Sequence, residues 1–363
     1  MSVNSQAMLQ TLQIASTIGD GIPSPRSRAG AQVVFTLADE DRRLFFPDHN
    51  DCLPVETIWI NAPWMERAEW DECLAEHRPR VLVTGWNTPA LPERHAAVRG
   101  GSVDYVCHVT GSVRQIVTRE LIACGLKVSN WGTLAAPQVA EHALLLALAA
   151  LRNLGAWREF MCRPADEQHW HKHQLATRTL HGKRVAIHGF GSIAREFIAL
   201  LQPFHAQVTA FSEGVPPSFM QKHGASPAAS LRELAENADV FIECEALTEA
   251  NVGSVNAAVL SALPRGAVFV NVGRGAVVDE TALVEMAREY GLRVAGDVFA
   301  SEPLPPDSPI FALPGAVLSP HIGGPAFDTY PACGARALEN VRRYLAGLQP
   351  EGLITTEIFD RST

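Results

Sequence analysis

The sequence predicts an α/β protein with two doubly wound, parallel-sheet domains of the Rossmann or flavodoxin-like type. Short apolar runs typical of strands alternate with helix-like stretches along most of the chain. A glycine-rich turn, with Gly189, Gly191 and Ala194 in a G-x-G-x-x-A pattern, follows one of these runs and opens a helical pattern. The 363 residues are enough for two domains with separate cores.

The first α/β unit lies between about residues 30 and 130 and contains no glycine-rich nucleotide loop. A helix is expected at about 65–76. The expected strands lie at 55–60, 80–84, 105–109 and 126–128. The next segment, 136–151, is a strong helix pattern whose apolar face is so wide that we expect it to be buried between the domains.

The second unit repeats the strand–helix alternation and begins at the strand before the glycine turn. Helices are expected at 192–201 and at 231–237, with Ser230 as the N-cap of the latter, and a final helix at about 329–345. The expected strands lie at 185–187, 207–211, 240–243, 268–270, 292–295 and 316–318.

Composition excludes several classes of protein. Thirty Lys and Arg against 39 Asp and Glu give a formal net charge of −9, which argues against nucleic acid or an anionic membrane as a partner. The seven cysteines are scattered without a C-x-x-C pair, which favours free thiols in a reducing compartment. The N-terminus has no Lys or Arg before Arg26 and no long apolar stretch, so no secretory signal is expected; the longest apolar run, 143–151, is too short for a membrane span. We therefore expect a cytoplasmic protein, in which residues 1–28 form either an arm or a subunit contact.

The glycine turn is typical of a dinucleotide site. Gly189 permits the tight turn, Gly191 lets the backbone approach a pyrophosphate, and the following helix N-terminus favours an anion. An acidic residue normally ends the next strand and binds the ribose hydroxyls, but here Ser212 and then Glu213 follow it. No arginine follows to receive a 2′-phosphate, so NAD is favoured and NADP stays possible. The simpler alternative is a glycine turn without a ligand.

Three short segments each follow an apolar strand pattern in the last third of the chain: 271–275, 297–303 and 319–324. Since ligands bind outside the carboxyl ends of parallel strands, one crevice would receive Arg274, Glu302 and His321. Arg274 can hold a carboxylate, His321 can exchange a proton with a carbonyl or hydroxyl oxygen, and Glu302 can hold the imidazole. A structural histidine and a surface ion pair are the alternatives. The histidine-rich segment 169–173 has no recognised metal-ligand spacing, so no metal site is expected.

Together with these segments, the stretches 139–143, 182–194, 263–267 and 337–347 resemble the D-isomer-specific 2-hydroxyacid dehydrogenases over about residues 80–350. The resemblance implies an NAD(P)-dependent enzyme that interconverts a small D-2-hydroxy acid and a 2-keto acid, and a homodimer. It also implies a nucleotide-binding domain, 135–325, inserted in a substrate-binding domain made of 1–134 and 326–363.

The resemblance also implies roles for individual residues. Arg274 would bind the substrate carboxylate, His321 would be the acid/base paired with Glu302, and Asp297 would contact the nicotinamide amide. The substrate would be bound by Thr110, Gly111, Ser112, Arg274 and His321. The cofactor would be bound by Gly189, Phe190, Gly191, Ser192, Ile193, Ser212, Glu213, Thr248, Val272, Gly273, Arg274, Asp297, His321, Gly323 and Gly324.

The chain departs from the family pattern at two places. Cys244 and Ala246 stand where the family often has a histidine and a proline, and carboxylates beside them make this wall acidic. Arg114 replaces an acid in the loop 108–114, which concerns the substrate more than the chemistry. Trp86 and Trp131 lie on loops near the expected cleft and are open to two interpretations, packing or lining for a bulky substrate.

A second function class fits the same residues. A non-catalytic NAD(H)-sensing protein of this fold would keep the arginine, glutamate and histidine, although basic tails and peptide-docking tracts are missing from this sequence. A formate dehydrogenase is disfavoured because Glu302 stands where that enzyme pairs glutamine with histidine.

Overall fold

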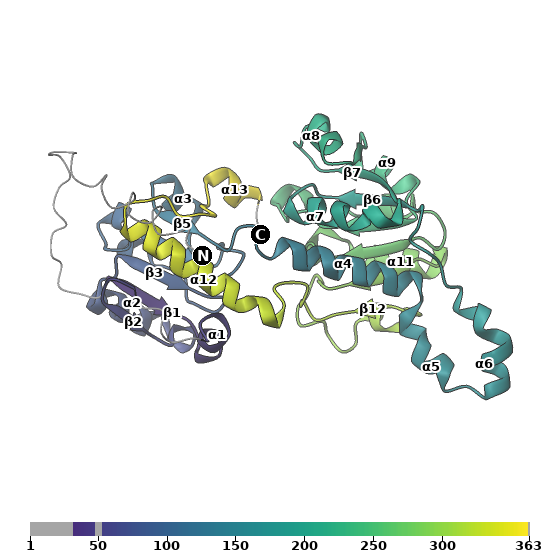
Figure 1. The fold of residues 1–363 in the computed structure, drawn as a ribbon, viewed down its shortest axis with the longest axis horizontal. Coiled ribbons are helices and arrows are strands. Elements are labelled where there is room, and N and C mark those ends of the chain that lie inside the picture. The colour runs from purple at the N-terminus through teal and green to yellow at the C-terminus, as the bar shows by residue number, and fades with distance from the viewer. Residues whose placement is uncertain (1–31, 48–52, 362–363) are drawn as a thin grey trace, which may run out of the picture. The chain divides into compact units, whose positions relative to one another are not determined.

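The computed structural model describes residues 32–47 and 53–361. The expectation for residues 1–28 lies outside this part of the chain. Two parallel sheets, each covered by helices on both faces, confirm the predicted α/β class (Figure 1).

The first sheet has the strand order β2-β1-β3-β4-β5. Its strands are β1 (Val33–Thr36), β2 (Thr57–Trp59), β3 (Val81–Thr84), β4 (Tyr105–His108) and β5 (Lys127–Ser129). The helices beside it are α1 (Asp39–Phe45), α2 (Arg67–His77), α3 (Arg119–Ala123), α12 (Tyr330–Leu345) and α13 (Thr356–Arg361). Apolar residues of α1 and α12 cover one face and those of α2, α3 and α13 the other, so the C-terminal helices return to the first sheet.

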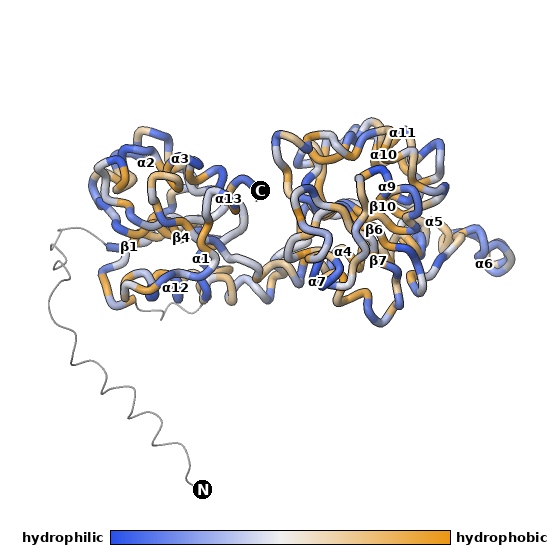
Figure 2. The backbone as a smooth tube through the Cα atoms, turned by 90° about the horizontal axis from the view of Figure 1, so that it is seen from above, coloured by the Kyte–Doolittle hydropathy of each residue, from blue (hydrophilic) through white to orange (hydrophobic). Residues whose placement is uncertain are grey.

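The second sheet has the order β12-β11-β10-β9-β6-β7-β8. Its strands are β6 (Arg184–His188), β7 (Gln207–Phe211), β8 (Ser226–Pro227), β9 (Val240–Glu243), β10 (Val268–Asn271), β11 (Arg293–Gly296) and β12 (Val317–Leu318). Its helices are α4 (Ala136–Leu151), α7 (Ser192–Leu201), α8 (Pro217–Lys222), α9 (Leu231–Glu236), α10 (Ala257–Leu260) and α11 (Glu280–Tyr290). α4, α7 and α8 cover one face and α9, α10 and α11 the other, and Figure 2 shows the apolar residues concentrated on β6, β7 and β10.

Helix α4 is buried on most of its surface, where it packs against α7, β10 and β11. Its exposed positions, Pro137, Glu141 and Leu145, recur every four residues and form a single stripe. Leu145, one of these positions, is 56% exposed, so part of the apolar surface of this helix stays open to solvent. After α4 come two unpredicted helices, α5 (Trp157–Met161) and α6 (Ala165–His171), which extend away from the sheet in Figure 1.

The second sheet reverses its strand order between β6 and β9, which are neighbours although two strands separate them in sequence. In the pairing of these two strands, His188 at the end of β6 lies opposite Glu243 at the end of β9. Open α/β sheets bind ligands at such a reversal, outside the carboxyl ends of the strands. The glycine turn that follows His188 therefore lies at the expected ligand position.

Within the described ranges, no single helix has the length and apolar composition to cross a bilayer; only α4 combined with 154–161, bent by 57°, meets both criteria. The six cysteines of the described chain are free, and no group of three or more His, Cys, Asp or Glu side chains there could hold a metal ion.

Candidate active site

The glycine turn fits closely against the loop after β9. Gly189 has φ +100°, and a Cβ placed on it would lie 2.7 Å from the backbone of Cys244 and Glu245. In contrast, a Cβ on Gly191 would meet no atom within 4 Å. Gly191 is the N-cap of α7, so amide groups at the start of this helix border open space. The turn thus leaves room for an anionic group at the N-terminus of α7.

A cavity of about 610 Å³ lies beside this turn. Gly189 itself does not line it, because it is covered by the β9 loop. The predicted cofactor residues that line the cavity are Phe190, Gly191, Ser192, Ile193, Ser212, Glu213, Thr248, Val272, Gly273 and Arg274. The remaining ones, Asp297, His321, Gly323 and Gly324, line a second cavity of about 690 Å³, and Arg274 lines both.

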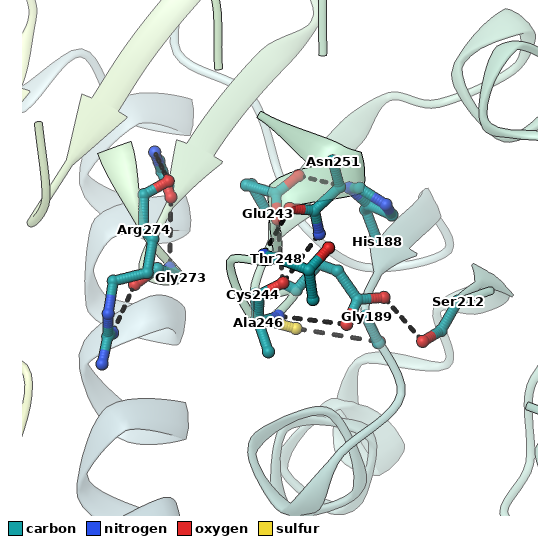
Figure 3. Close-up of polar contacts among 12 residues, drawn as sticks. His188, Gly189, Ser212, Glu243, Cys244, Ala246, Thr248, Asn251, Gly273 and Arg274 are labelled. Atoms are coloured by element: carbon teal, nitrogen blue, oxygen red, sulfur yellow. Dashed lines mark hydrogen bonds and ion pairs between the residues drawn. The ribbon is translucent and has the colours of Figure 1, made fainter. Parts of the chain in front are cut away.

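A buried ion pair joins the ends of β6 and β9 (Figure 3). His188 Nδ1 lies 2.5 Å from Glu243 Oε2, and both side chains are almost inaccessible. Burial disfavours the charge on His188, but Glu243 outweighs this effect and raises the pKa of His188; burial in turn raises the pKa of Glu243. The other carboxylate oxygen, Glu243 Oε1, accepts a 2.8 Å hydrogen bond from the backbone N–H of Glu245. The pair thus fixes the loop that covers Gly189.

Glu245 in turn reaches the end of β7. Its Oε2 accepts a 2.6 Å hydrogen bond from the hydroxyl of Ser212, and its Oε1 accepts one of 3.0 Å from the N–H of Ala246. Ser212 is buried, whereas Glu213 is exposed. The carboxylate at the end of β7 is therefore provided by a neighbouring loop.

Arg274 follows strand β10 and lies between the two cavities. Its Nη1 donates a 2.7 Å hydrogen bond to the carbonyl oxygen of Gly273. Burial lowers the pKa of Arg274 and Glu302 opposes the shift, so the guanidinium keeps its charge at neutral pH. The next residue, Gly275, is required for packing, because a Cβ there would lie 1.8 Å from the carbonyl carbon of Phe299. This close contact joins the loop of Arg274 to the loop of Glu302.

His321 and Glu302 form the predicted pair. His321 Nδ1 lies 2.6 Å from Glu302 Oε2, while Glu302 Oε1 accepts a 2.9 Å hydrogen bond from the N–H of Phe299. An ionised carboxylate only accepts, so the proton of this contact belongs to Nδ1, and Nε2 is left for a ligand. The His321 side chain is 48% exposed, and its φ of 54° is in the left-handed region. The backbone of the loop 319–324 therefore needs support from elsewhere.

Asp297 provides that support. Its Oδ1 accepts hydrogen bonds from the Ser319 hydroxyl (2.6 Å) and the Ile322 N–H (2.9 Å), and its Oδ2 accepts one from the Gly323 N–H (2.8 Å). Burial alone would raise the pKa of Asp297, but hydrogen bonds from His142, Ser319 and the two amides hold it at about 2. Asp297 thus anchors the loop that carries His321. Its predicted contact with the nicotinamide amide stays a prediction.

His142 of α4 belongs to the same network, and sequence reasoning gave it no role. Its Nε2 lies 2.8 Å from Ser319 Oγ. Because the single hydroxyl hydrogen of Ser319 points to Asp297, His142 Nε2 is the donor in this contact.

The second cavity brings together only some of the predicted substrate residues. Gly111, Ser112, Arg274 and His321 line it, whereas Thr110 does not. Thr110 is fully buried and its hydroxyl lies 2.5 Å from His108 Nε2, so its side chain serves the core. Trp86 and Trp131 also line the cavity. Their rings pack edge to face, with a distance of 6.4 Å between the ring centroids.

Arg114 lies at the same cavity, where it donates a 2.7 Å hydrogen bond to the carbonyl oxygen of Phe359. Besides the His142–Ser319 contact, two groups were missed from the sequence: the His188–Glu243 pair and the Ser212–Glu245 contact. The available signals were His188, directly before the first glycine of the turn, and the two carboxylates Glu243 and Glu245 at the end of β9 and just after it.

The chain is similar to known proteins over most of its length. A family model described as "D-isomer specific 2-hydroxyacid dehydrogenase, NAD binding domain" matches residues 144–323. A hydroxyphenylpyruvate reductase of Plectranthus scutellarioides is 31% identical over 232 residues, which are 63% of this chain and 72% of that protein. A D-3-phosphoglycerate dehydrogenase of Mycobacterium bovis is 33% identical over 300 residues, 81% of this chain but only 53% of that protein.

A crystal structure of a protein from Thermus thermophilus superposes with a TM-score of 0.71 and 25% identity, covering 89% of this chain and 99% of that one. The chain spans about half the length of the D-3-phosphoglycerate dehydrogenases that it matches.

Proposed function

Because the chain belongs to the D-isomer specific 2-hydroxyacid dehydrogenase family, we propose that it is an NAD(P)-dependent oxidoreductase that interconverts a D-2-hydroxy acid and a 2-keto acid. One observation carries the proposal. Arg274 and His321, the latter held by Glu302, line the second cavity together, and Arg274 also lines the cavity beside the glycine turn. A cation for a carboxylate and a proton donor for a neighbouring oxygen are the two groups that this reaction needs from the protein.

Each of these residues has its own task in the reaction. When bound, the nicotinamide supplies or accepts the hydride. Arg274 holds the substrate carboxylate and orients the keto carbon. His321 donates a proton from Nε2 to the keto oxygen during reduction and takes it back during oxidation. Glu302 accepts the hydrogen bond from Nδ1 and stabilises the imidazolium. Glycine-turn amides hold the pyrophosphate, and Gly111 and Ser112 close the substrate side.

The proposal includes the division into a substrate-binding domain (1–134 and 326–363) and a nucleotide-binding domain (135–325). The return of α12 and α13 to the first sheet supports it. We also propose a homodimer in the cytoplasm, for which the free cysteines and the exposed apolar side chains near α5 are the supporting observations.

The test is the oxidation of NADH and NADPH, followed by absorbance, with a panel of 2-keto acids from glyoxylate and pyruvate to hydroxypyruvate and phenylpyruvate. We expect turnover with at least one of them. His321→Ala should lower kcat by about 100-fold or more, since general acid–base catalysis contributes this much. Arg274→Ala should raise KM at least as much as it lowers kcat, because it removes the carboxylate anchor.

As a control, the affinity of each variant for NADH is measured by the quenching of tryptophan fluorescence, so that a loss of cofactor binding is distinguished from a loss of catalysis. NADH binding without turnover of any keto acid would contradict the enzymatic proposal and favour the NAD(H)-sensing alternative. Unchanged kinetics in Arg274→Ala would exclude its role as the carboxylate anchor.

A further inference from the structure

The adenine-side ribose site lacks its usual acid at the end of the second strand of the nucleotide-binding unit. β7 ends at Phe211, and the next side chain, Ser212, is a buried hydroxyl. The neighbouring Glu213 is exposed, and it is its backbone carbonyl oxygen that contacts Arg361. A ribose with two free hydroxyls prefers a fixed carboxylate at this position.

Glu245 brings such a carboxylate to the same place from a different strand. β7, β6 and β9 are adjacent in the sheet, and the glycine turn follows the middle one. The loop after β9 crosses over Gly189 closely enough for a Cβ there to lie 2.7 Å from the Glu245 nitrogen. Beyond that crossing, Glu245 Oε2 lies 2.6 Å from Ser212 Oγ, and both residues line the cavity.

The carboxylate is rigidly held. Its Oε1 accepts from the N–H of Ala246, and the N–H of Glu245 itself is bound by Glu243, which the buried His188 fixes. Figure 3 shows His188, Glu243 and Ser212 converging on this loop from three strands. A group held on both sides loses little conformational entropy when it binds a ligand.

The carboxylate of Glu245 makes the local charge negative. His188 compensates Glu243 by direct contact, whereas the Glu245 oxygens accept from a neutral hydroxyl and a neutral amide. Arg361 of α13 lines the same cavity and keeps its positive charge, and it donates a 3.3 Å hydrogen bond to the carbonyl oxygen of Glu213, not to Glu245. The Glu245 carboxylate would repel a second negative group placed directly beside it.

We propose that Glu245 is the residue that selects the cofactor: its carboxylate accepts the ribose 2′-hydroxyl in place of the missing acid on β7 and repels a 2′-phosphate. The inference rests on the proposed function, since it presumes a dinucleotide on the glycine turn. It assigns the ligand class as nucleotides with an unmodified adenosine ribose.

Binding, without catalysis, tests the assignment. Isothermal titration calorimetry would compare ADP-ribose with 2′-phospho-ADP-ribose, and NADH with NADPH, on the full chain. We expect the unphosphorylated ligands to bind about 100-fold more tightly, because the 2′-phosphate would be placed beside a like charge. Glu245→Gln should narrow this ratio by about tenfold or more, mainly by tightening the phosphorylated ligands.

Matched variants distinguish Glu245 from the other side chains near the proposed ribose site. Glu249→Gln changes an exposed carboxylate on the same loop and should leave the ratio unchanged. Ser212→Ala leaves the carboxylate of Glu245 in place, so the variant should still bind the unphosphorylated ligands much more tightly than the 2′-phosphorylated ones. Arg361→Ala should not weaken the phosphorylated ligands. Thermal melting of each variant checks that it is folded.

Three results would overturn the assignment. The unmodified protein could bind the phosphorylated and unphosphorylated ligands equally, or Glu245→Gln could leave the affinity ratio of the two ligand types unchanged. The third is that Glu213→Gln, and not Glu245→Gln, lowers this ratio. If ADP-ribose and NADH both fail to bind, the proposed function falls together with the inference. Binding without discrimination overturns the inference alone.

Discussion

Glu302 connects His321, the proposed acid/base residue, to the backbone of the loop after β11. One of its oxygens receives the N–H of Phe299 and the other faces His321 Nδ1. The first contact fixes the carboxylate, and the second fixes which imidazole nitrogen carries the proton in the resting state. The orientation of the histidine ring and the position of its ring proton are therefore set by the same side chain.

The first prediction at the residue scale concerns this dual role. Glu302→Gln keeps an oxygen for Phe299 but turns an amide N–H toward Nδ1, so the imidazolium loses its counter-charge. We expect kcat to fall about 100-fold while the affinity for NADH changes little. Steady-state kinetics and NADH titration measure the two quantities separately.

Glu280→Gln is the matched control for that experiment. Glu280 accepts a 2.6 Å hydrogen bond from the N–H of Ala300 in the same loop but does not contact His321. If both variants lose the same activity, Glu302 acts by anchoring the loop, and its proposed contact with the imidazolium has no catalytic weight.

At the scale of elements, the loop 319–324 keeps its shape through Asp297 at the end of β11. The residue is 3% exposed, and its carboxylate holds a hydroxyl and two backbone amides. Its pKa is held at about 2, against an ordinary value of 3.8. A shift of this size corresponds to about 2 kcal/mol of stability when the group is ionised.

Asp297→Asn should therefore lower the free energy of unfolding by about 2 kcal/mol at neutral pH. The folded pKa lies below the unfolded one, so the contribution is complete above about pH 5 and is lost as the pH falls toward 2. Urea unfolding at several pH values would show the gap between the two proteins narrowing on acidification. A gap that is independent of pH would contradict the role of the charge. Asp307→Asn, which changes an exposed carboxylate, serves as the control.

The sequence predicted those elements whose signals are local. The helix 231–237 with its Ser230 cap is found as α9, where the Ser230 hydroxyl accepts from the Glu233 N–H. The predicted pairing of Glu302 with His321 is present as a contact, because both follow neighbouring strands. Strand β1 and helix α1, which precede the first predicted strand, were not predicted.

The parts of the site that escaped prediction join segments that are distant in sequence. His188 meets Glu243 and Ser212 meets Glu245 only because the chain places β6 between β7 and β9. His142 meets Ser319 only because α4 packs beside β11 and β12. Strand order decides such contacts, and a single sequence does not determine which strands become neighbours across the reversal.

At the scale of the whole molecule, an apolar surface near the end of α4 has no covering element within the described chain. Leu145 is on the exposed stripe of α4, and Leu154, Trp157 and Met161, the last 66% exposed, follow it on η4 (Leu154–Ala156) and α5. Exposed apolar groups gathered on one segment are typical of an interface, and the family resemblance suggests a homodimer.

The last prediction tests whether this segment is the contact between subunits. Trp157→Glu introduces a charge at the centre of the apolar surface, and we expect it to convert a dimer into a monomer at micromolar concentration, because a buried unpaired charge destabilises an interface. Light scattering after size exclusion measures the mass. Phe311→Glu, which alters an exposed aromatic residue on η9 (Pro309–Ala312), should leave the dimer intact. A monomeric unmodified protein would contradict the homodimer, whereas a Trp157→Glu variant that remains dimeric would move the contact to another surface.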